Sequence, residues 1–265
     1  MAQSLPIGLF DSGVGGLTVM AAVRKALPRE RLVYLGDTAR VPYGTKSPEV
    51  VRRYAVKCAQ FLLEQGAKMV VVACNTASAH AIPALRAELE VPVVGVIEPG
   101  ARLAAETTRN GRVGVIGTEG TVASGTYQES LGRARPGVEV HAVACPMFVP
   151  LAEEGLCDHP ATRLLAQDYL SPLKARDIDT LVLGCTHYPL LSPAIEQVMG
   201  PSIRIVDSAG AVAAAAAAVL RERGLEAAHA SGDDTFYATD VSARVLRVGS
   251  AFLGRNIEQV RLVDL

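Results

Sequence analysis

Short runs of aliphatic residues alternate with longer amphipathic segments along most of the chain. Such runs, bounded by glycine or small polar residues, are typical of strands buried on both faces of a parallel sheet. We expect strands over residues 7–10, 31–35, 68–73, 92–97, 112–117, 138–144, 180–184, 203–206 and 235–238. We expect helices over residues 17–27, 48–65, 101–109, 160–175, 211–222 and 242–253, with another after Cys74 that Pro83 interrupts. This alternation predicts an α/β fold with doubly wound, mainly parallel sheets.

The pattern restarts near the middle of the chain. Gly8-Leu9-Phe10 aligns with Gly114-Val115-Ile116, and Cys74 aligns with Cys185 at a similar spacing. These landmarks predict a pseudo-duplicated pair of lobes, although sequence identity between the two halves is slight.

Two cysteines each follow one of the apolar runs. Cys74 comes after 69–73 and Cys185 after 180–184, and small polar residues that suit a helix N-cap follow both. In open α/β sheets, ligands bind at the carboxyl ends of the strands. An isolated cysteine there is more often a small buried hydrophobe, an interpretation that fits the other three cysteines: Cys58, Cys145 and Cys157. Because the presentation occurs twice, we expect Cys74 and Cys185 to be reactive thiols that face one ligand.

Composition narrows the possible partners. The 265 residues are 49% hydrophobic and 20% charged, with a net charge of −1, so the chain can form one large domain or two smaller ones. A net charge this close to zero does not indicate binding to nucleic acid or to an anionic membrane. The first residues do not resemble a signal peptide, and the longest apolar run, 212–220, is too short to span a bilayer. Five cysteines without a CxxC pair favour reduced thiols in a cytoplasm.

The glycine-rich segment after the first strand has two interpretations. Gly13-x-Gly15-Gly16, with Asp37 after the next strand, is similar to a dinucleotide fingerprint, but its third glycine is absent. The Asp11 carboxylate would also repel a pyrophosphate. A tight strand-to-helix turn is the favoured interpretation, and Asp11-Ser12 could serve as an N-cap or contact a polar ligand.

Two further residues are candidates for proton transfer. His187 lies two residues after Cys185, so an acid/base role is favoured over that of a partly buried structural histidine. Glu153 is followed by Glu154, and spacing alone does not distinguish it from a solvated side chain.

Four segments together resemble the motifs of the glutamate racemase family. They are Asp11 to Thr18, Pro42-Tyr43-Gly44, Ala73 to Ala77, and Gly184 to Leu190. The resemblance implies two α/β lobes related by a pseudo-twofold axis, with the active site in the cleft between them. The first lobe would comprise residues 1–97 and 209–265, and the second, residues 98–208.

The resemblance also implies a cofactor-independent interconversion of L- and D-glutamate with two bases. Cys74 would deprotonate the D-enantiomer with support from Asp11, and Cys185 the L-enantiomer with support from Glu153 and His187. Substrate contacts would come from these residues: Asp11, Ser12, Tyr43, Gly44, Asn75, Thr76, Thr186 and His187. No metal is implied. Family members supply D-glutamate for peptidoglycan, so we expect a cytoplasmic homodimeric enzyme.

Three alternatives stay open at this stage. A related racemase could act on aspartate or another small acid, since the sequence does not measure pocket depth. A non-catalytic amino-acid-binding protein would have little use for two such thiols, and an oxidoreductase is disfavoured further by the incomplete fingerprint.

Overall fold

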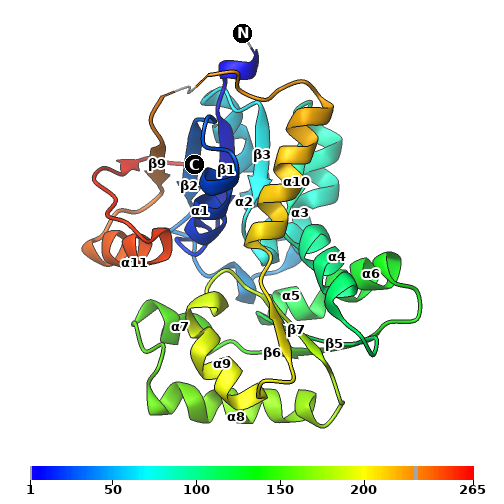
Figure 1. Ribbon diagram of the computed structural model, residues 1–265. Helices are drawn as coiled ribbons and strands as arrows, with labels where there is room; N and C mark the ends of the chain where they lie inside the picture. The colour runs from blue at the N-terminus through cyan, green and yellow to red at the C-terminus, as the bar shows by residue number, and fades with distance from the viewer. Residues whose placement is uncertain (1, 230–231) are drawn as a thin grey trace. The chain divides into compact units, whose positions relative to one another are not determined.

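The computed structural model describes residues 2–229 and 232–265 (Figure 1). Residues 1, 230 and 231, which fall in the first predicted lobe, lie outside the described residues. The chain divides into two compact units. Unit 1 comprises Met1–Val96 and Ala209–Leu265, and unit 2 comprises Ile97–Ser208.

A six-stranded parallel sheet forms the centre of unit 1, in the order β10-β9-β2-β1-β3-β4. Its strands are β1 (Ile7–Asp11), β2 (Leu32–Gly36), β3 (Met69–Val72), β4 (Val93–Gly95), β9 (Thr235–Ala238) and β10 (Arg261–Leu262). Every residue of β1, β2 and β3 is buried, which explains why these strands are continuous apolar runs.

Helices cover both faces of this sheet. They are α1 (Leu17–Ala26), α2 (Pro48–Glu64), α3 (Asn75–Glu88), α10 (Ala209–Glu222) and α11 (Ala243–Leu253), with 3₁₀ turns η1 (Ala2–Ser4) and η2 (Tyr43–Thr45). Phe10 and Val72 share one core cluster with α2 and α3. Alternate residues of each strand face the opposite way, and α1 packs there against β2, α10 and α11.

Unit 2 is built on a four-stranded parallel sheet in the order β6-β5-β7-β8. Its strands are β5 (Arg112–Gly117), β6 (Glu139–Ala144), β7 (Thr180–Gly184) and β8 (Arg204–Val206). Its helices are α4 (Ile97–Thr107), α5 (Glu119–Ala123), α6 (Thr126–Ala134), α7 (Phe148–Glu153), α8 (Pro160–Lys174) and α9 (Ser192–Met199), with the 3₁₀ turn η3 (Tyr188–Leu191). Ile116 and Leu183 pack with α8 and α9 in one core cluster.

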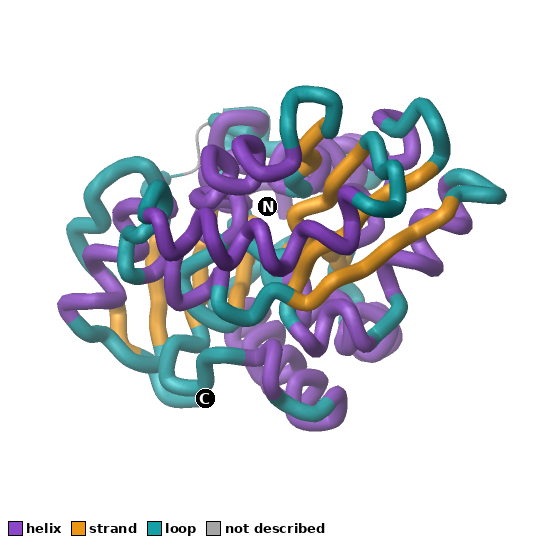
Figure 2. Tube along the Cα trace, turned by 90° about the horizontal axis from the view of Figure 1, so that it is seen from below, coloured by secondary structure: helices purple, strands orange, loops and turns teal. Residues whose placement is uncertain are grey.

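The two units repeat one strand order. The segment β2-β1-β3-β4 of unit 1 matches β6-β5-β7-β8 of unit 2, and Figure 2 shows strands and helices alternating along the chain. The predicted α/β fold with mainly parallel sheets is confirmed. In each unit a cysteine follows the third strand of the repeat: Cys74 lies two residues after the end of β3, and Cys185 directly follows β7.

Two local predictions were wrong. The helix expected over 101–109 begins at Ile97, because Pro99 lies in its first turn, where a missing N–H costs little. Pro83 does not interrupt α3, which continues to Glu88 because its buried residues pack into the core on both sides of the proline. The C-terminal tail adds a short strand, β10, parallel to β9.

Among the described residues, none of the helices has the length and apolar character needed to cross a membrane.

Candidate active site

Cys74 lies at the carboxyl edge of the unit 1 sheet. Phe10 pairs with Val72, and the amide of Ala73 donates to the Phe10 carbonyl at 2.9 Å. This register brings Cys74 beside Ser12, with 3.6 Å between Sγ and Oγ. The structure therefore joins two of the predicted site residues through the pairing of β1 with β3.

The sulfur of Cys74 caps helix α3. It accepts a hydrogen bond from the backbone N–H of Ala77 at 3.4 Å, and the residue is 5% exposed. Asn75 and Thr76 are the first two residues of the helix, and both are buried. A helix N-terminus stabilises negative charge, so this position favours the thiolate form of Cys74.

Asp11, the last residue of β1, is completely buried. Its Oδ2 accepts from the backbone N–H of Gly13 at 2.9 Å, and its carbonyl accepts from the amide of Asp37 at 3.0 Å. A Cβ on Gly16 would lie 2.6 Å from the Asp11 Cβ, so this glycine is required by close packing. The tight-turn interpretation of the glycine-rich segment agrees with this packing.

The side chain of Tyr43 is directed into the core of unit 1. Its hydroxyl donates to Oδ2 of Asp37 at 2.5 Å, while the hydroxyl of Thr239 donates to Oδ1 at 2.9 Å. Burial raises the pKa of Tyr43 above its ordinary value, and Cys58 and Asp37 act in the same direction. The phenol is thus engaged with Asp37, which leaves the backbone of Tyr43 and Gly44 for the predicted substrate contact. The same contacts occupy the Asp37 carboxylate, which argues against a ribose partner.

In unit 2, the structure brings Cys185, His187 and Glu153 together. Nδ1 of His187 lies 3.8 Å from Sγ of Cys185 and 3.5 Å from Oγ1 of Thr186. Nε2 of the same ring lies 3.1 Å from Oε1 of Glu153. Cys185, Thr186 and His187 are buried, whereas the Glu153 side chain is 21% exposed. The histidine therefore links a buried thiol to a carboxylate that reaches solvent.

Aromatic packing positions Glu153, the last residue of α7. Phe148 at the start of that helix meets Tyr188 of η3 edge-to-face, with ring centroids 5.3 Å apart. The Tyr188 hydroxyl also donates to the carbonyl of Cys145 at 2.8 Å. Because Tyr188 directly follows His187, these contacts hold α7 against the segment that carries the imidazole.

Comparisons with known proteins identify the family of this chain. The model of the Asp/Glu/Hydantoin racemase family matches residues 11–216. A glutamate racemase from Geobacter metallireducens is 54% identical over 98% of this chain and 96% of its own length. This chain belongs to that racemase family. It is therefore an amino-acid racemase, an isomerase.

Solved structures of family members share the whole fold. Glutamate racemase isoform RacE1 from Bacillus anthracis superposes with a TM-score of 0.94 at 39% identity, covering 98% of both chains. The Francisella tularensis glutamate racemase, described in complex with D-glutamate, gives a TM-score of 0.93 at 34% identity. That match covers 99% of this chain and 98% of the other, so the family resemblance is confirmed over its full length.

The structural repeat identifies one further candidate residue, Thr118, which the sequence analysis missed. Gly117 pairs with Gly184, so continuing the register sets Thr118 opposite Cys185, as Ser12 is opposite Cys74. The Thr118 side chain accepts from the amide of Thr121 at 3.2 Å. Alignment of the two first strands was the signal that could have found it.

The two cysteine positions also differ from each other. Cys74 is the N-cap of a regular α-helix, whereas Cys185 precedes only the short 3₁₀ turn η3, with α9 beginning at Ser192. The helix dipole next to Cys185 is thus weaker than the one predicted from the sequence, because only a short 3₁₀ turn follows the cysteine.

Across residues 2–229 and 232–265, no group of three or more His, Cys, Asp or Glu side chains could hold a metal ion.

Proposed function

We propose that this racemase interconverts L- and D-glutamate by proton transfer through Cys74 and Cys185, without an added cofactor. The observation that carries the proposal is the recurrence of a cysteine within two residues of the end of the same strand of one repeated order in both units. Relatives named glutamate racemase support glutamate as the substrate. The proposal treats units 1 and 2 as two lobes that each supply one base to the same substrate carbon.

Racemisation requires removal of the Cα proton from one face and delivery of a proton to the other. A free thiol has a pKa of about 8.5, so only a few per cent is thiolate at neutral pH. The cycle needs one thiolate and one thiol at the same time. Cys74 would accept the proton of D-glutamate while Cys185 donates, and the roles would reverse for L-glutamate.

Each thiol has its own source of basicity. The amide of Ala77 and the N-terminus of α3 favour the Cys74 thiolate, and Asp11 opposes that charge as a nearby carboxylate. For Cys185, a Glu153 that accepts Nε2–H would make Nδ1 of His187 the acceptor for the thiol proton. In this scheme His187 holds the proton taken from the thiol, and the Glu153 carboxylate stabilises the resulting imidazolium.

The substrate carboxylates would be bound by backbone N–H groups and hydroxyls. The candidates are Asp11, Ser12, Tyr43, Gly44, Asn75, Thr76, Thr186 and His187. Two of them, Asn75 and Thr76, are the first residues of α3, a position that suits anions. The chain's lysines all lie outside the cysteine motifs, so no Schiff base is part of this proposal.

The cellular role follows from the same resemblance. We propose that the D-glutamate is used in peptidoglycan synthesis, that the enzyme is cytoplasmic, and that it acts as a homodimer. Sedimentation at several concentrations tests the dimer independently of activity.

Circular dichroism of D- and L-glutamate, with D- and L-aspartate in parallel, tests the substrate. Loss of the glutamate signal without added cofactor supports the proposal, whereas faster loss of the aspartate signal would favour an aspartate racemase.

Deuterium wash-in tests the roles of the thiols. Cys74→Ala and Cys185→Ala should both abolish racemisation, and Cys157→Ala, at a partly exposed thiol, should not. Wild-type racemisation in either of the first two variants would exclude the two-thiol scheme.

A further inference from the structure

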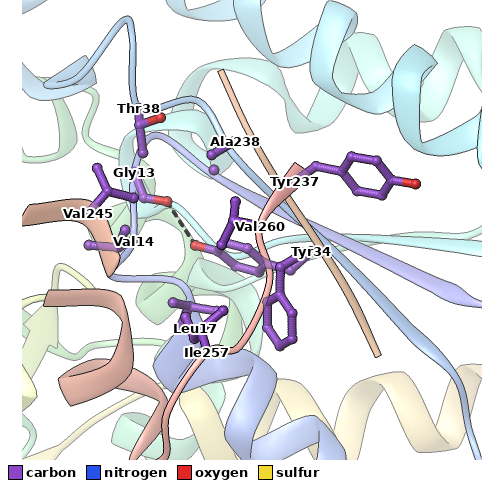
Figure 3. Close-up of a pocket in the computed structure, with 12 residues that line it drawn as sticks. Gly13, Val14, Leu17, Tyr34, Thr38, Tyr237, Ala238, Val245, Ile257 and Val260 are labelled. Atoms are coloured by element: carbon purple, nitrogen blue, oxygen red, sulfur yellow. Dashed lines mark hydrogen bonds between the residues drawn. The ribbon is translucent and has the colours of Figure 1, made fainter. Parts of the chain in front are cut away.

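The hydroxyl of Tyr34 is buried beneath the loop that joins β1 to α1. Tyr34 lies on β2 and is 3% exposed, and its hydroxyl donates to the carbonyl of Gly13 at 2.9 Å (Figure 3). The phenol ring also lines a cavity of about 20 Å³. Most of the side chains that surround this cavity are apolar, among them Val14, Leu17 and Val245.

Gly13 connects this hydroxyl to the Asp11 carboxylate. Its carbonyl accepts from Tyr34, and its N–H donates to Oδ2 of Asp11 at 2.9 Å. The same carbonyl also packs closely against Gly36 of β2, because a Cβ on Gly36 would lie only 2.5 Å from it. The backbone at Gly13 is thus fixed by β2, and it in turn orients Asp11.

The environment keeps Tyr34 in its donor form. Burial raises its pKa well above 10.0, nearby Asp11 and Cys74 act in the same direction, and a backbone hydrogen bond with Gly16 opposes them. The phenol therefore stays protonated near neutral pH, where it can donate to Gly13.

We propose that Tyr34 is a positioning residue for the Cys74 half of the reaction. By holding Gly13, it fixes the direction of the Asp11 carboxylate, the group that supports Cys74 in the proposed function. The inference rests on the proposed function, in which Cys74 removes the proton of D-glutamate. Water is a poor substitute for the lost hydroxyl, because the cavity offers few polar partners.

Tyr34→Phe tests this role, and Tyr237→Phe is its matched control. Tyr237 lies on the adjacent strand β9 and lines the same cavity, but its hydroxyl donates to Oε1 of Gln65 at 2.9 Å. We expect kcat to fall about tenfold in Tyr34→Phe, from loss of one buried hydrogen bond, and to stay near the wild-type value in Tyr237→Phe. Thermal unfolding of both variants verifies that each is folded.

Isotope effects separate positioning from a general loss of active enzyme. Enantiomers have equal free energies, so kcat/KM must remain equal in the two directions and cannot report on one base. A slower Cys74 step becomes more rate-limiting in both directions. In Tyr34→Phe, the isotope effect on kcat/KM should therefore rise for α-deuterated D-glutamate and fall for α-deuterated L-glutamate.

Each outcome has one meaning. Unchanged isotope effects, or equal activity of Tyr34→Phe and Tyr237→Phe, would overturn the positioning role while wild-type racemisation leaves the proposed function standing. A wild-type chain that does not racemise glutamate would overturn the proposed function itself, and this inference with it.

Discussion

Nε2 of His187 lies 3.1 Å from Oε1 of Glu153. The ring presents its other nitrogen, Nδ1, to the sulfur of Cys185 at 3.8 Å. A carboxylate on one side of an imidazole fixes both its orientation and its tautomer, so the two side chains act as one unit on the thiol.

Disruption of this unit should have non-additive effects. We expect His187→Asn to lower kcat about 100-fold through loss of an acid/base group, and Glu153→Gln to have a smaller effect. The double variant should be no slower than His187→Asn alone, because residues that act as a unit are not additive. Steady-state racemisation rates measure all three.

The neighbouring glutamate provides the control for that experiment. Glu154 is exposed at the end of α7, so Glu154→Gln should retain wild-type activity. If the loss of kcat in the His187→Asn, Glu153→Gln double variant equals the product of the two single losses, the single-unit interpretation is contradicted.

The five thiols should differ in reactivity toward iodoacetamide. Burial raises the pKa of Cys58 and Cys145, and proximity to Asp37 and to Cys185, respectively, acts in the same direction. Both should stay unlabelled in the folded protein near pH 8, while the partly exposed Cys157 is labelled. Peptide mass spectrometry after timed quenching gives the rates. Labelling of Cys58 as fast as Cys157 would contradict the burial argument.

Much of the fold could be predicted from the sequence because parallel strands buried on both faces leave continuous aliphatic runs. Residues 69–72 are such a run, and all four are buried in β3. Helix boundaries were less predictable, since packing decided them. α4 starts at Ile97, four residues before the helix predicted at 101–109, and α3 passes through Pro83.

Parts of the candidate site could not be predicted because they depend on tertiary contacts. The proximity of His187 to Cys185 followed from their spacing of two residues. Glu153 reaches His187 only because Phe148 packs on Tyr188, and no local pattern encodes that contact. Tyr34 was hidden within an apolar run, since its partner Gly13 belongs to the loop after the neighbouring strand.

Asp179 should make the stability of unit 2 depend on acid pH. Its carboxylate accepts four hydrogen bonds, from the Thr108 hydroxyl, the amides of Arg109 and Asn110, and the Thr180 hydroxyl. Burial alone would raise the pKa of Asp179, but these bonds outweigh it and lower the pKa below 3.8. The stabilisation is therefore complete above the unfolded pKa and is lost as pH falls through the folded value.

Asp179→Asn tests this dependence. The difference in melting temperature from wild type should be constant above about pH 5 and shrink below the ordinary aspartate pKa. Asp177→Asn is the control, since that side chain is 83% exposed and its positive φ of 52° is tolerated by asparagine. A difference that persists undiminished under acid conditions would contradict the role assigned to the Asp179 carboxylate.

A buried ion pair should stabilise unit 1 without influencing catalysis. Nζ of Lys68 lies 2.6 Å from Oε2 of Glu30, and both side chains are 2% exposed. The same ammonium donates to the carbonyls of Gln3 and Leu225, at 2.7 and 2.8 Å. Glu30 lies two residues before β2 and Lys68 directly before β3, at the end of the sheet opposite Cys74. Lys68 therefore ties segments from three parts of the chain to the amino-terminal ends of the strands.

Lys68→Met should lower the free energy of unfolding by about 3–5 kcal/mol, because it leaves the Glu30 carboxylate buried without its counter-charge. Adding Glu30→Gln should recover part of that loss, since the amide oxygen can still accept from the amide of Ala227. Arg221→Met removes an exposed pair with Glu226 and should cost less than about 1 kcal/mol. Urea unfolding measures each change, and racemisation by the folded variants should be unaltered. A double variant less stable than Lys68→Met alone would show that the uncompensated charge is not the cause, because neutralising that charge would then bring no relief.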